Sequence, residues 1–216
     1  MSYLTNPDNW DLSISTSIPN LLFEQLYVTF VSLAIAVLIA FPLALLVARY
    51  RRLYTPVLTT TSILYTIPSL AAFAFLIPVT GLAAPTVIIP LVIYSQVVLI
   101  RNIVAAIRSV DPALVEVGRA MGMNRWQLQL RVILPLALPV IVAGIRITVV
   151  TQIAVATVAA YINAGGLGDI IFQGITQDFG EKIAAGAVLT SLLAIAADES
   201  LKLVERRLRA ATSERL

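Results

Sequence analysis

The segment Asp111-Pro-Ala-Leu-Val-Glu-Val-Gly-Arg-Ala-Met-Gly-Met-Asn-Arg-Trp126 is polar and lies between two long hydrophobic segments of the chain. The preceding one runs from about Ala84 to Ile100 and can continue as helix to Ile107. The following one runs from about Val132 to Tyr161. As a helix, each is long enough to cross the ~30 Å hydrocarbon layer of a bilayer. The polar segment is therefore predicted to connect two membrane spans.

The connecting segment itself predicts two short helices joined by a tight bend. Asp111 can cap a helix and Pro112 suits its first position, which predicts a helix over Ala113–Met121. Gly122 can adopt the left-handed conformation that ends a helix, and the Asn-x-x-Gln pattern at Asn124 is typical of a second helix start. The alternative is an ordinary amphipathic connector whose arginines lie on lipid headgroups. The side chains expected at the surface are Glu116, Arg119, Met121, Met123 and Trp126.

The composition indicates an all-α polytopic membrane protein. Hydrophobic residues make up 59% of the 216 residues, charged residues only 12%, and the mean hydropathy is +0.91. A soluble domain is nearer one quarter charged. The length accommodates about five spans of roughly 20 residues each. The five predicted transmembrane helices are Leu26–Ala48, Val57–Val79, Ala84–Ile100, Val132–Tyr161 and Ile183–Val204.

The basic residues predict the orientation of these helices. Arginines follow the first span, fill the loop between spans three and four, and close the chain, whereas Lys182 is the only basic residue on the opposite side. Positive charge collects on the cytoplasmic side, so the N-terminus is expected outside and the C-terminus inside. No charged n-region precedes the first span, which is expected to remain as a helix. The predicted divisions are an extracytoplasmic segment 1–25, a transmembrane domain 26–208 with a cytoplasmic loop 109–131 and an extracytoplasmic segment 163–180, and a cytoplasmic tail 209–216.

Several kinds of chemistry are excluded by residue usage. The chain has no cysteine and no histidine, which removes thiol nucleophiles, imidazole bases and the common transition-metal sites. Neither Lys182 nor Lys202 lies in a Gly-x4-Gly-Lys phosphate loop, so the chain cannot hydrolyse ATP in that manner. No catalytic or metal site is predicted. Gly165-Gly-Leu-Gly168 follows no strand, which favours a flexible turn before a short gate-like helix, Asp169–Gly174, over phosphate binding.

Polar residues inside the predicted spans have two interpretations. They can form hydrogen bonds between helices, or they can line a solute path, because lipid offers them no partners. The ring of Tyr94 could present its face to a cation. The candidate path residues are Tyr65, Ser69, Tyr94, Gln96, Thr151 and Gln152.

One charged pair inside the membrane is predicted from depth alone. Arg146 lies about 16 Å beyond Pro135 along the fourth span, and Asp198 lies about 12 Å before Arg206 along the fifth, at 1.5 Å per residue. An unpaired charge at this depth is costly, so we expect an ion pair, with Asp198 favoured over Glu199. The alternative is that Arg146 extends to the headgroups and Asp198 sits in interfacial water.

The polar loop resembles the cytoplasmic loop by which ABC importer permeases contact their ATPase. Glu116 is followed six residues later by Gly122, ten further by the β-branched Val132, and then by Leu134 and Pro135. Val132 stands where isoleucine is usual, and a Val-Gly pair replaces the two alanines after the glutamate. The resemblance to glycine betaine/carnitine/choline importer permeases covers nearly the whole chain. It is carried by Tyr65-Thr-Ile-Pro-Ser-Leu70, Val110-Asp-Pro-Ala-Leu114, Ala120-Met-Gly-Met123, Leu134-Pro-Leu-Ala-Leu-Pro-Val140, Ala143-Gly-Ile-Arg146 and Ala164-Gly-Gly-Leu-Gly-Asp169 with Ile171-Phe172 and Gly174.

This resemblance implies a permease with a five-helix core in a bacterial or archaeal cell membrane. It implies a second permease chain, identical or paralogous, two ATPase subunits that bind ATP and Mg, and an extracytoplasmic substrate-binding protein. The implied substrates are compatible solutes such as glycine betaine, choline, carnitine or proline betaine. The implied gate residues are Gly165, Gly166, Gly168 and Asp169. The implied docking residues are Asp111, Pro112, Glu116, Arg119, Ala120, Met121, Gly122, Met123, Trp126 and Pro135.

Three alternatives stay open at this point. The chain could serve an importer of amino acids or other small solutes. It could be a scaffold that anchors another protein through the arginine-rich loop. It could be a membrane-embedded enzyme, although no histidine, cysteine or clustered carboxylates are available for chemistry. Co-purification of an ATPase with substrate-stimulated hydrolysis would separate a permease from a scaffold.

Overall fold

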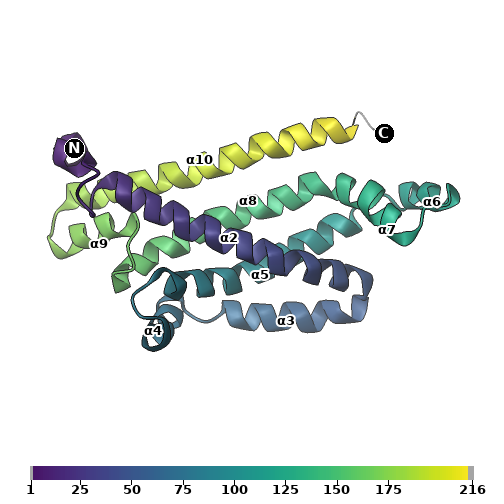
Figure 1. Ribbon diagram of the computed structural model, residues 1–216, viewed down its shortest axis with the longest axis horizontal. Coiled ribbons are helices and arrows are strands. Elements are labelled where there is room, and N and C mark those ends of the chain that lie inside the picture. The colour runs from purple at the N-terminus through teal and green to yellow at the C-terminus, as the bar shows by residue number, and fades with distance from the viewer. Residues whose placement is uncertain (1, 214–216) are drawn as a thin grey trace.

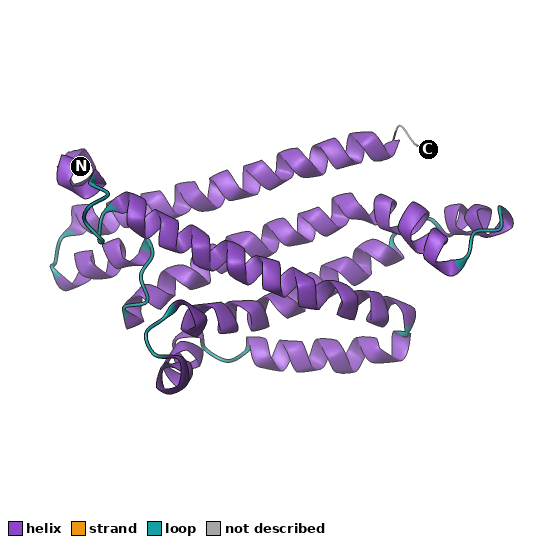
Figure 2. Cartoon of the chain, in the orientation of Figure 1, coloured by secondary structure: helices purple, strands orange, loops and turns teal. Residues whose placement is uncertain are grey.

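A computed structural model describes the backbone of residues 2–213, so the end of the predicted tail, 214–216, lies outside the described residues. Within this range the chain is helical and contains no strand (Figures 1 and 2). The longer helices are α2 Ile18–Arg49, α3 Tyr54–Tyr65, α4 Ser69–Thr80, α5 Ala84–Arg108, α6 Pro112–Ala120, α8 Leu134–Ala159, α9 Gly168–Thr176 and α10 Gly180–Ser213. The short elements are α1 Ser2–Thr5, α7 Arg125–Leu128, a π-helical segment Gln129–Ile133, and 3-10 turns Pro7–Trp10, Arg51–Leu53 and Ala160–Ile162.

The described residues contain three helices that are long and apolar enough to cross a membrane. These are α2, α5 and the run Arg125–Ile162 that includes α8. The broken pair Arg51–Tyr65 and Ser69–Thr80 adds a fourth if it counts as one span. The predicted fifth span lies inside α10, a helix of 34 residues. The all-helical membrane fold is confirmed, while the count of five spans and their orientation stay predictions.

The second predicted span is not one continuous helix. It breaks between α3 and α4, whose axes differ by 83°. Pro68 explains the break, because it lacks a backbone N–H and disfavours the helical conformation of Ile67 before it. The freed carbonyl of Ile67 accepts a hydrogen bond of 2.8 Å from the Tyr94 hydroxyl. Two other boundaries also differ from expectation: α2 begins at Ile18 rather than Leu26, and α10 continues to Ser213 rather than Val204.

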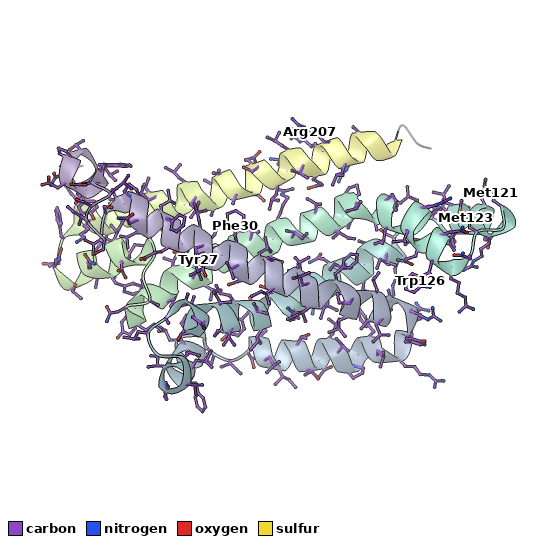
Figure 3. All side chains as sticks on the ribbon, in the orientation of Figure 1. Tyr27, Phe30, Met121, Met123, Trp126 and Arg207 are labelled. Carbon is purple, nitrogen blue, oxygen red and sulfur yellow. The ribbon has the colours of Figure 1, made fainter. Side chains whose placement is uncertain are left out.

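The helices pack as a bundle in which α2 lies against α5, α5 against α8, and α8 against α10 (Figure 1). Small residues permit these close approaches. Ala36, Ala40 and Ala44 of α2 are fully buried in the core shared with α5. A Cβ on Gly144 of α8 would lie 2.5 Å from the Cβ of Asn102 on α5. The opposite face of α2 exposes large side chains, including Tyr27 and Phe30 in Figure 3.

The two predicted functional segments lie at opposite ends of the bundle. The helices α6 and α7 project from one end, beyond the corner where α2 turns into α3 (Figure 1). The helices α1 and α9 lie at the other end, near the start of α10. A continuous helical run, from α7 through the π-helical segment into α8, leads from the first end toward the second.

Candidate functional site

The local geometry of the polar loop follows the predicted capping residues. The Asp111 carboxylate accepts a hydrogen bond of 2.8 Å from the backbone N–H of Ala113, and Pro112 is the first residue of α6. Gly122 adopts a left-handed conformation with φ +79°. Its neighbour Met123 donates its backbone N–H to the Gly118 carbonyl at 3.2 Å, which closes the C-terminus of α6. The predicted helix and bend are confirmed, with α6 ending at Ala120.

The second short helix begins with a reciprocal cap. The backbone N–H of Gln127 donates to the Asn124 side-chain oxygen at 2.9 Å, and the backbone N–H of Asn124 donates to the Gln127 side-chain oxygen at 2.9 Å. The predicted helix start is therefore confirmed. After Leu128 the helix widens into the π-helical segment, where the Leu134 N–H bonds to the Gln129 carbonyl. Sequence reasoning did not predict this segment.

The loop exposes a patch of large apolar side chains together with the charged residues Glu116 and Arg119. Met121 is 72% exposed and Trp126 is 75% exposed (Figure 3). Met123 is half-buried, which corrects the expectation that it lies at the surface. Other apolar members of the patch are Val117 and Leu130. Exposed apolar groups of this size gathered on one projecting segment are typical of a protein contact surface.

A buried glycine explains why Met123 turns inward. A Cβ on Gly118 would lie 2.7 Å from Cδ1 of Leu128 and 3.5 Å from the sulfur of Met123. Gly118 therefore allows α6 to lie directly on α7, with Met123 in the joint between them. Of the remaining docking candidates, Ala120 is exposed at the end of α6 and Pro135 is half-buried at the start of α8.

The glycine turn at the other end is held by α2. Gly165 and Gly166 both have left-handed backbones, with φ +80° and +86°. The Gly166 N–H donates to a Glu24 carboxylate oxygen at 3.0 Å. A Cβ on Gly166 would lie 2.5 Å from the side-chain oxygen of Gln25, whose amide N–H donates to the Ile153 carbonyl at 3.1 Å. Sequence reasoning missed Glu24 and Gln25. The signal was a polar pair near the N-terminal end of an apolar helix.

The predicted gate helix is present as α9, which begins at Gly168. A Cβ at Gly168 would overlap the carbonyl oxygen of Thr157, so only glycine allows α9 to pack on the end of α8. Asp169 in its first turn is half-buried. Burial and the nearby Glu24 carboxylate raise the pKa of Asp169, and Lys182 opposes that rise.

A buried lysine fixes α9 to α10. Lys182 is only 8% exposed, and its ammonium group donates to the side-chain oxygens of Gln173 at 2.8 Å and Gln177 at 3.2 Å. It also lies over the ring of Tyr3, 5.4 Å from the centroid. Burial lowers the pKa of Lys182, while the Asp169 carboxylate raises it. Sequence reasoning placed Lys182 in an extracytoplasmic loop and missed this contact.

The mid-span polar residues split into several groups. Gln152 donates to the Ser95 hydroxyl at 2.8 Å, and a small hollow between α5 and α8 is lined by Tyr94, Thr151 and Gln152. Gln96 lies elsewhere, with its amide N–H 3.3 Å from the Ala36 carbonyl of α2. Tyr65 packs edge-on against Tyr94, with ring centroids 5.8 Å apart, and Ser69 starts α4.

Both interpretations of these polar residues draw support. The bonds of Gln96 and Gln152 join helices, as the first interpretation predicts. Their buried side-chain oxygens, however, lack hydrogen-bond partners within the described residues. Buried acceptors of this kind are usually paired, and a passing ligand or water could satisfy the one on the hollow.

The structure brings Arg146 and Asp198 together. Arg146 Nε and Nη2 donate to the two Asp198 carboxylate oxygens at 3.0 and 2.8 Å, a bidentate arrangement. A second carboxylate, Glu205, accepts from Arg146 Nη1 at 2.7 Å. Glu199 instead pairs with Lys202 at 2.6 Å. Glu205 was missed, although its spacing of two helical turns from Asp198 places both on one face of α10.

Comparison with known proteins covers most of the chain. The model of the family described as binding-protein-dependent transport system inner membrane component matches residues 32–210. The carnitine transport permease protein OpuCD of Listeria monocytogenes is 44% identical over 181 residues, which are 83% of this chain and 81% of the relative. The glycine betaine/carnitine/choline transport system permease protein OpuCD of Bacillus subtilis is 44% identical over 174 residues, 80% of this chain and 76% of the relative.

A solved structure shares the fold. It is an inward-facing conformation of the MetNI methionine ABC transporter, which superposes with a TM-score of 0.79 at 26% identity. The superposition covers 88% of this chain and 95% of that chain. The exposed loop, the glycine turn and the ion pair between α8 and α10 are thus features of a chain that is similar to transport permeases along nearly its whole length.

Proposed function

Because the chain belongs to the family of inner membrane components of binding-protein-dependent transport systems, we propose that it forms part of the path by which an ABC importer takes up compatible solutes with a quaternary ammonium group. The observation that carries the substrate class is the 44% identity over four fifths of the chain to permeases named for carnitine and for glycine betaine, carnitine and choline. As a permease subunit, the chain is not itself catalytic.

The complex contains a second permease chain, two ATPase subunits and an extracytoplasmic substrate-binding protein, and it resides in a bacterial or archaeal cell membrane. ATP and Mg bind to the ATPase subunits. The apolar patch around Met121 and Trp126 supports such a partner, because it projects from the bundle and is covered by no other part of the described chain. Glu116 beside the patch supplies a charged contact.

The helical run from α7 into α8 transmits movement of the ATPase subunits to the solute path. When ATP closes the ATPase pair, the docking helices of the two permeases are drawn together. Thr151 and Gln152 of α8 line the hollow, and Arg146 of α8 contacts α10. A rotation of α8 therefore changes the shape of the hollow and the contact with α10. Two alternative arrangements of such an element, biased by nucleotide, are sufficient for alternating access.

The glycine turn and α9 form the outer gate. Two left-handed glycines and three contacts, from Glu24, Gln25 and Lys182, hold α9 on the end of the bundle in this conformation. A change in the separation of α2 and α8 breaks the contacts of Glu24 and Gln25 and releases the glycine turn, while Lys182 keeps α9 attached to α10.

Uptake by the reconstituted complex tests the proposal. The chain, its ATPase and its binding protein are assembled in liposomes, and ATP-dependent uptake of labelled glycine betaine, choline and carnitine is compared with uptake of methionine. We expect saturable uptake of at least one quaternary ammonium solute that excess unlabelled glycine betaine or carnitine inhibits. Uptake of none of them would reject the substrate class.

An amino-acid importer is the second candidate function. Its support is the fold, which superposes on a methionine transporter at a TM-score of 0.79. Calorimetric titration of the cognate binding protein with both classes of solute separates the two. Heat of binding for an amino acid alone would favour the second candidate.

A further inference from the structure

We propose that the corner between α2 and α3 is a binding site for the headgroup of an anionic phospholipid. At this corner α2 ends with Arg49, the chain turns through the short 3-10 segment, and α3 begins at Tyr54. The corner encloses an open hollow of about 720 Å³, within the range of about 300–1,000 Å³ that is usual for small-ligand sites. Its lining residues are Leu46, Arg49, Tyr50, Arg51, Arg52 and Leu53.

The three arginines of the hollow have no ion pair within the described residues. All three are exposed, and Arg49 lies over the Tyr50 ring at 5.4 Å from the centroid. The sequence contains no acidic residue between Glu24 and Asp111, so no carboxylate of the neighbouring helices can neutralise them. Arg146 and Arg209, by contrast, both contact carboxylates of α10. The hollow therefore carries three positive charges that are unpaired in the described part of the chain, which favour the binding of an anion from outside the chain.

Guanidinium groups favour phosphate as that anion. Each presents a planar fork of N–H donors that can bond two phosphate oxygens at once. Arg51 and Arg52 are consecutive residues of the 3-10 turn, and Arg49 is the last residue of α2. All three arginines therefore line a single hollow.

The surroundings of the hollow favour a lipid phosphate over a dissolved one. Leu46 is 45% exposed and Tyr50 is 50% exposed, which places apolar and interfacial side chains beside the charges. Tyrosine is enriched at the headgroup level of membranes. The hollow also lies at the end of the long apolar helix α2, while the docking helices α6 and α7 project further along the same axis (Figure 1). This position suits a headgroup whose acyl chains run along α2.

Binding of a short-chain lipid to the purified full chain tests the site. Dihexanoyl phosphatidylglycerol is titrated in detergent and counted by native mass spectrometry, with dihexanoyl phosphatidylcholine as the neutral probe. An arginine near an anionic headgroup contributes roughly fivefold in affinity. The R51Q/R52Q double variant should therefore bind phosphatidylglycerol about 25-fold more weakly, and R51K/R52K should lose less. The neutral lipid should show no saturable binding.

The matched control neutralises the adjacent arginines Arg206 and Arg207, which are exposed and lie on α10, a different helix from the hollow; Arg207 is labelled in Figure 3. R206Q/R207Q should change the affinity less than about twofold, well below the contribution expected of one arginine in a site. Equal weakening in both double variants would show a diffuse charge effect and overturn the proposal. Displacement of the lipid by an equal concentration of inorganic phosphate would also overturn it, because the site would then be one for dissolved anions.

Discussion

Individual glycines in the turns between helices carry two separate constraints. Gly166 and Gly81 both have positive φ angles, +86° and +69°, but Gly166 also lacks the space for a side chain beside Gln25, whereas Gly81 has open space around it. Substitutions at these two glycines therefore distinguish the effect of backbone strain from the effect of steric overlap.

We expect Gly166→Val to reduce uptake at least tenfold while the complex still assembles. The added side chain forces Gln25 away and disturbs its bond to Ile153, beyond the backbone strain of about 1–2 kcal/mol that any residue incurs there. Uptake in liposomes and co-purification of the ATPase are the two measurements. Gly81→Val, with strain alone, should retain most uptake; equal loss in both variants would assign the effect to the backbone.

Asp169 makes the docking of α9 sensitive to pH. Burial and Glu24 raise its pKa, with Lys182 acting in the opposite direction. A raised pKa means that the packed state favours the protonated form. The contribution to stability is complete below the unfolded pKa of about 3.9 and is lost as the pH rises through the folded value.

Amide hydrogen exchange of α9 measures this dependence. Protection factors of α9, corrected for intrinsic exchange, should be higher on the acidic side of the Asp169 transition than at neutral pH. Asp169→Asn should remove the difference. The exposed Asp178→Asn serves as the control and should leave it intact. Persistence of the full difference in Asp169→Asn would refute the assignment of the pH dependence to Asp169.

At the scale of elements, the contact between α8 and α10 depends on one arginine shared by two carboxylates. The side chains of Arg146, Asp198 and Glu205 are 20%, 32% and 12% exposed, so the network is partly shielded from water. Removal of the arginine leaves the Asp198 carboxylate without its bidentate partner, while Glu205 keeps its contact with Arg209.

Arg146→Ala should destabilise the chain by about 1–3 kcal/mol, less than a fully buried pair because the groups are partly exposed. Asp198→Ala in the same background should recover part of the loss. Thermal unfolding in detergent gives the double-mutant cycle, and strictly additive losses would deny the coupling. The exposed pair of Lys202 and Glu199 is the control, where Lys202→Ala should cost about 0.5 kcal/mol or less.

The docking helices can be tested without disturbing the bundle. Glu116 is exposed, and a Cβ at Gly122 would contact nothing within 4 Å. Glu116→Ala or Gly122→Asp should therefore leave the chain inserted and folded, but abolish the stimulation of ATP hydrolysis by substrate-loaded binding protein. Phe75→Ala removes an 87% exposed side chain from α4 and should keep that stimulation. Normal stimulation in both loop variants would refute the docking assignment.

At the scale of the whole molecule, features that depend on local sequence were predicted better than contacts between residues far apart in the chain. The caps at Asp111 and Asn124, the left-handed Gly122 and the partner of Arg146 all follow from spacing along one or two helices. The contact of Glu24 with Gly166 joins residues far apart in the chain, so no periodicity points to it.

The remaining misses have a related cause. The sharp turn at Pro68 was not predicted within the second span, because it also depends on Tyr94, a residue of another helix whose hydroxyl donates to the Ile67 carbonyl. Met123 turned inward because Gly118 leaves room between two short helices. Both outcomes depend on tertiary packing, which hydrophobic patterns do not encode.

The π-helical segment sets the angular phase between the docking helices and α8. A π turn holds one more residue than an α turn, as the bond from the Leu134 N–H to the Gln129 carbonyl shows. Each residue advances an α-helix by about 100°. Deleting Leu130 should let the segment relax to α-helix with the phase nearly kept, because a π turn and an α turn each close roughly one full turn despite the extra residue. Inserting one alanine after Leu130, beyond what the existing π turn absorbs, should instead turn the docking face by about 100° about the axis of α8. The docking surface for the ATPase and the solute path would each remain intact, but the two would be rotated relative to one another. ATP hydrolysis should therefore continue at its unstimulated rate without uptake.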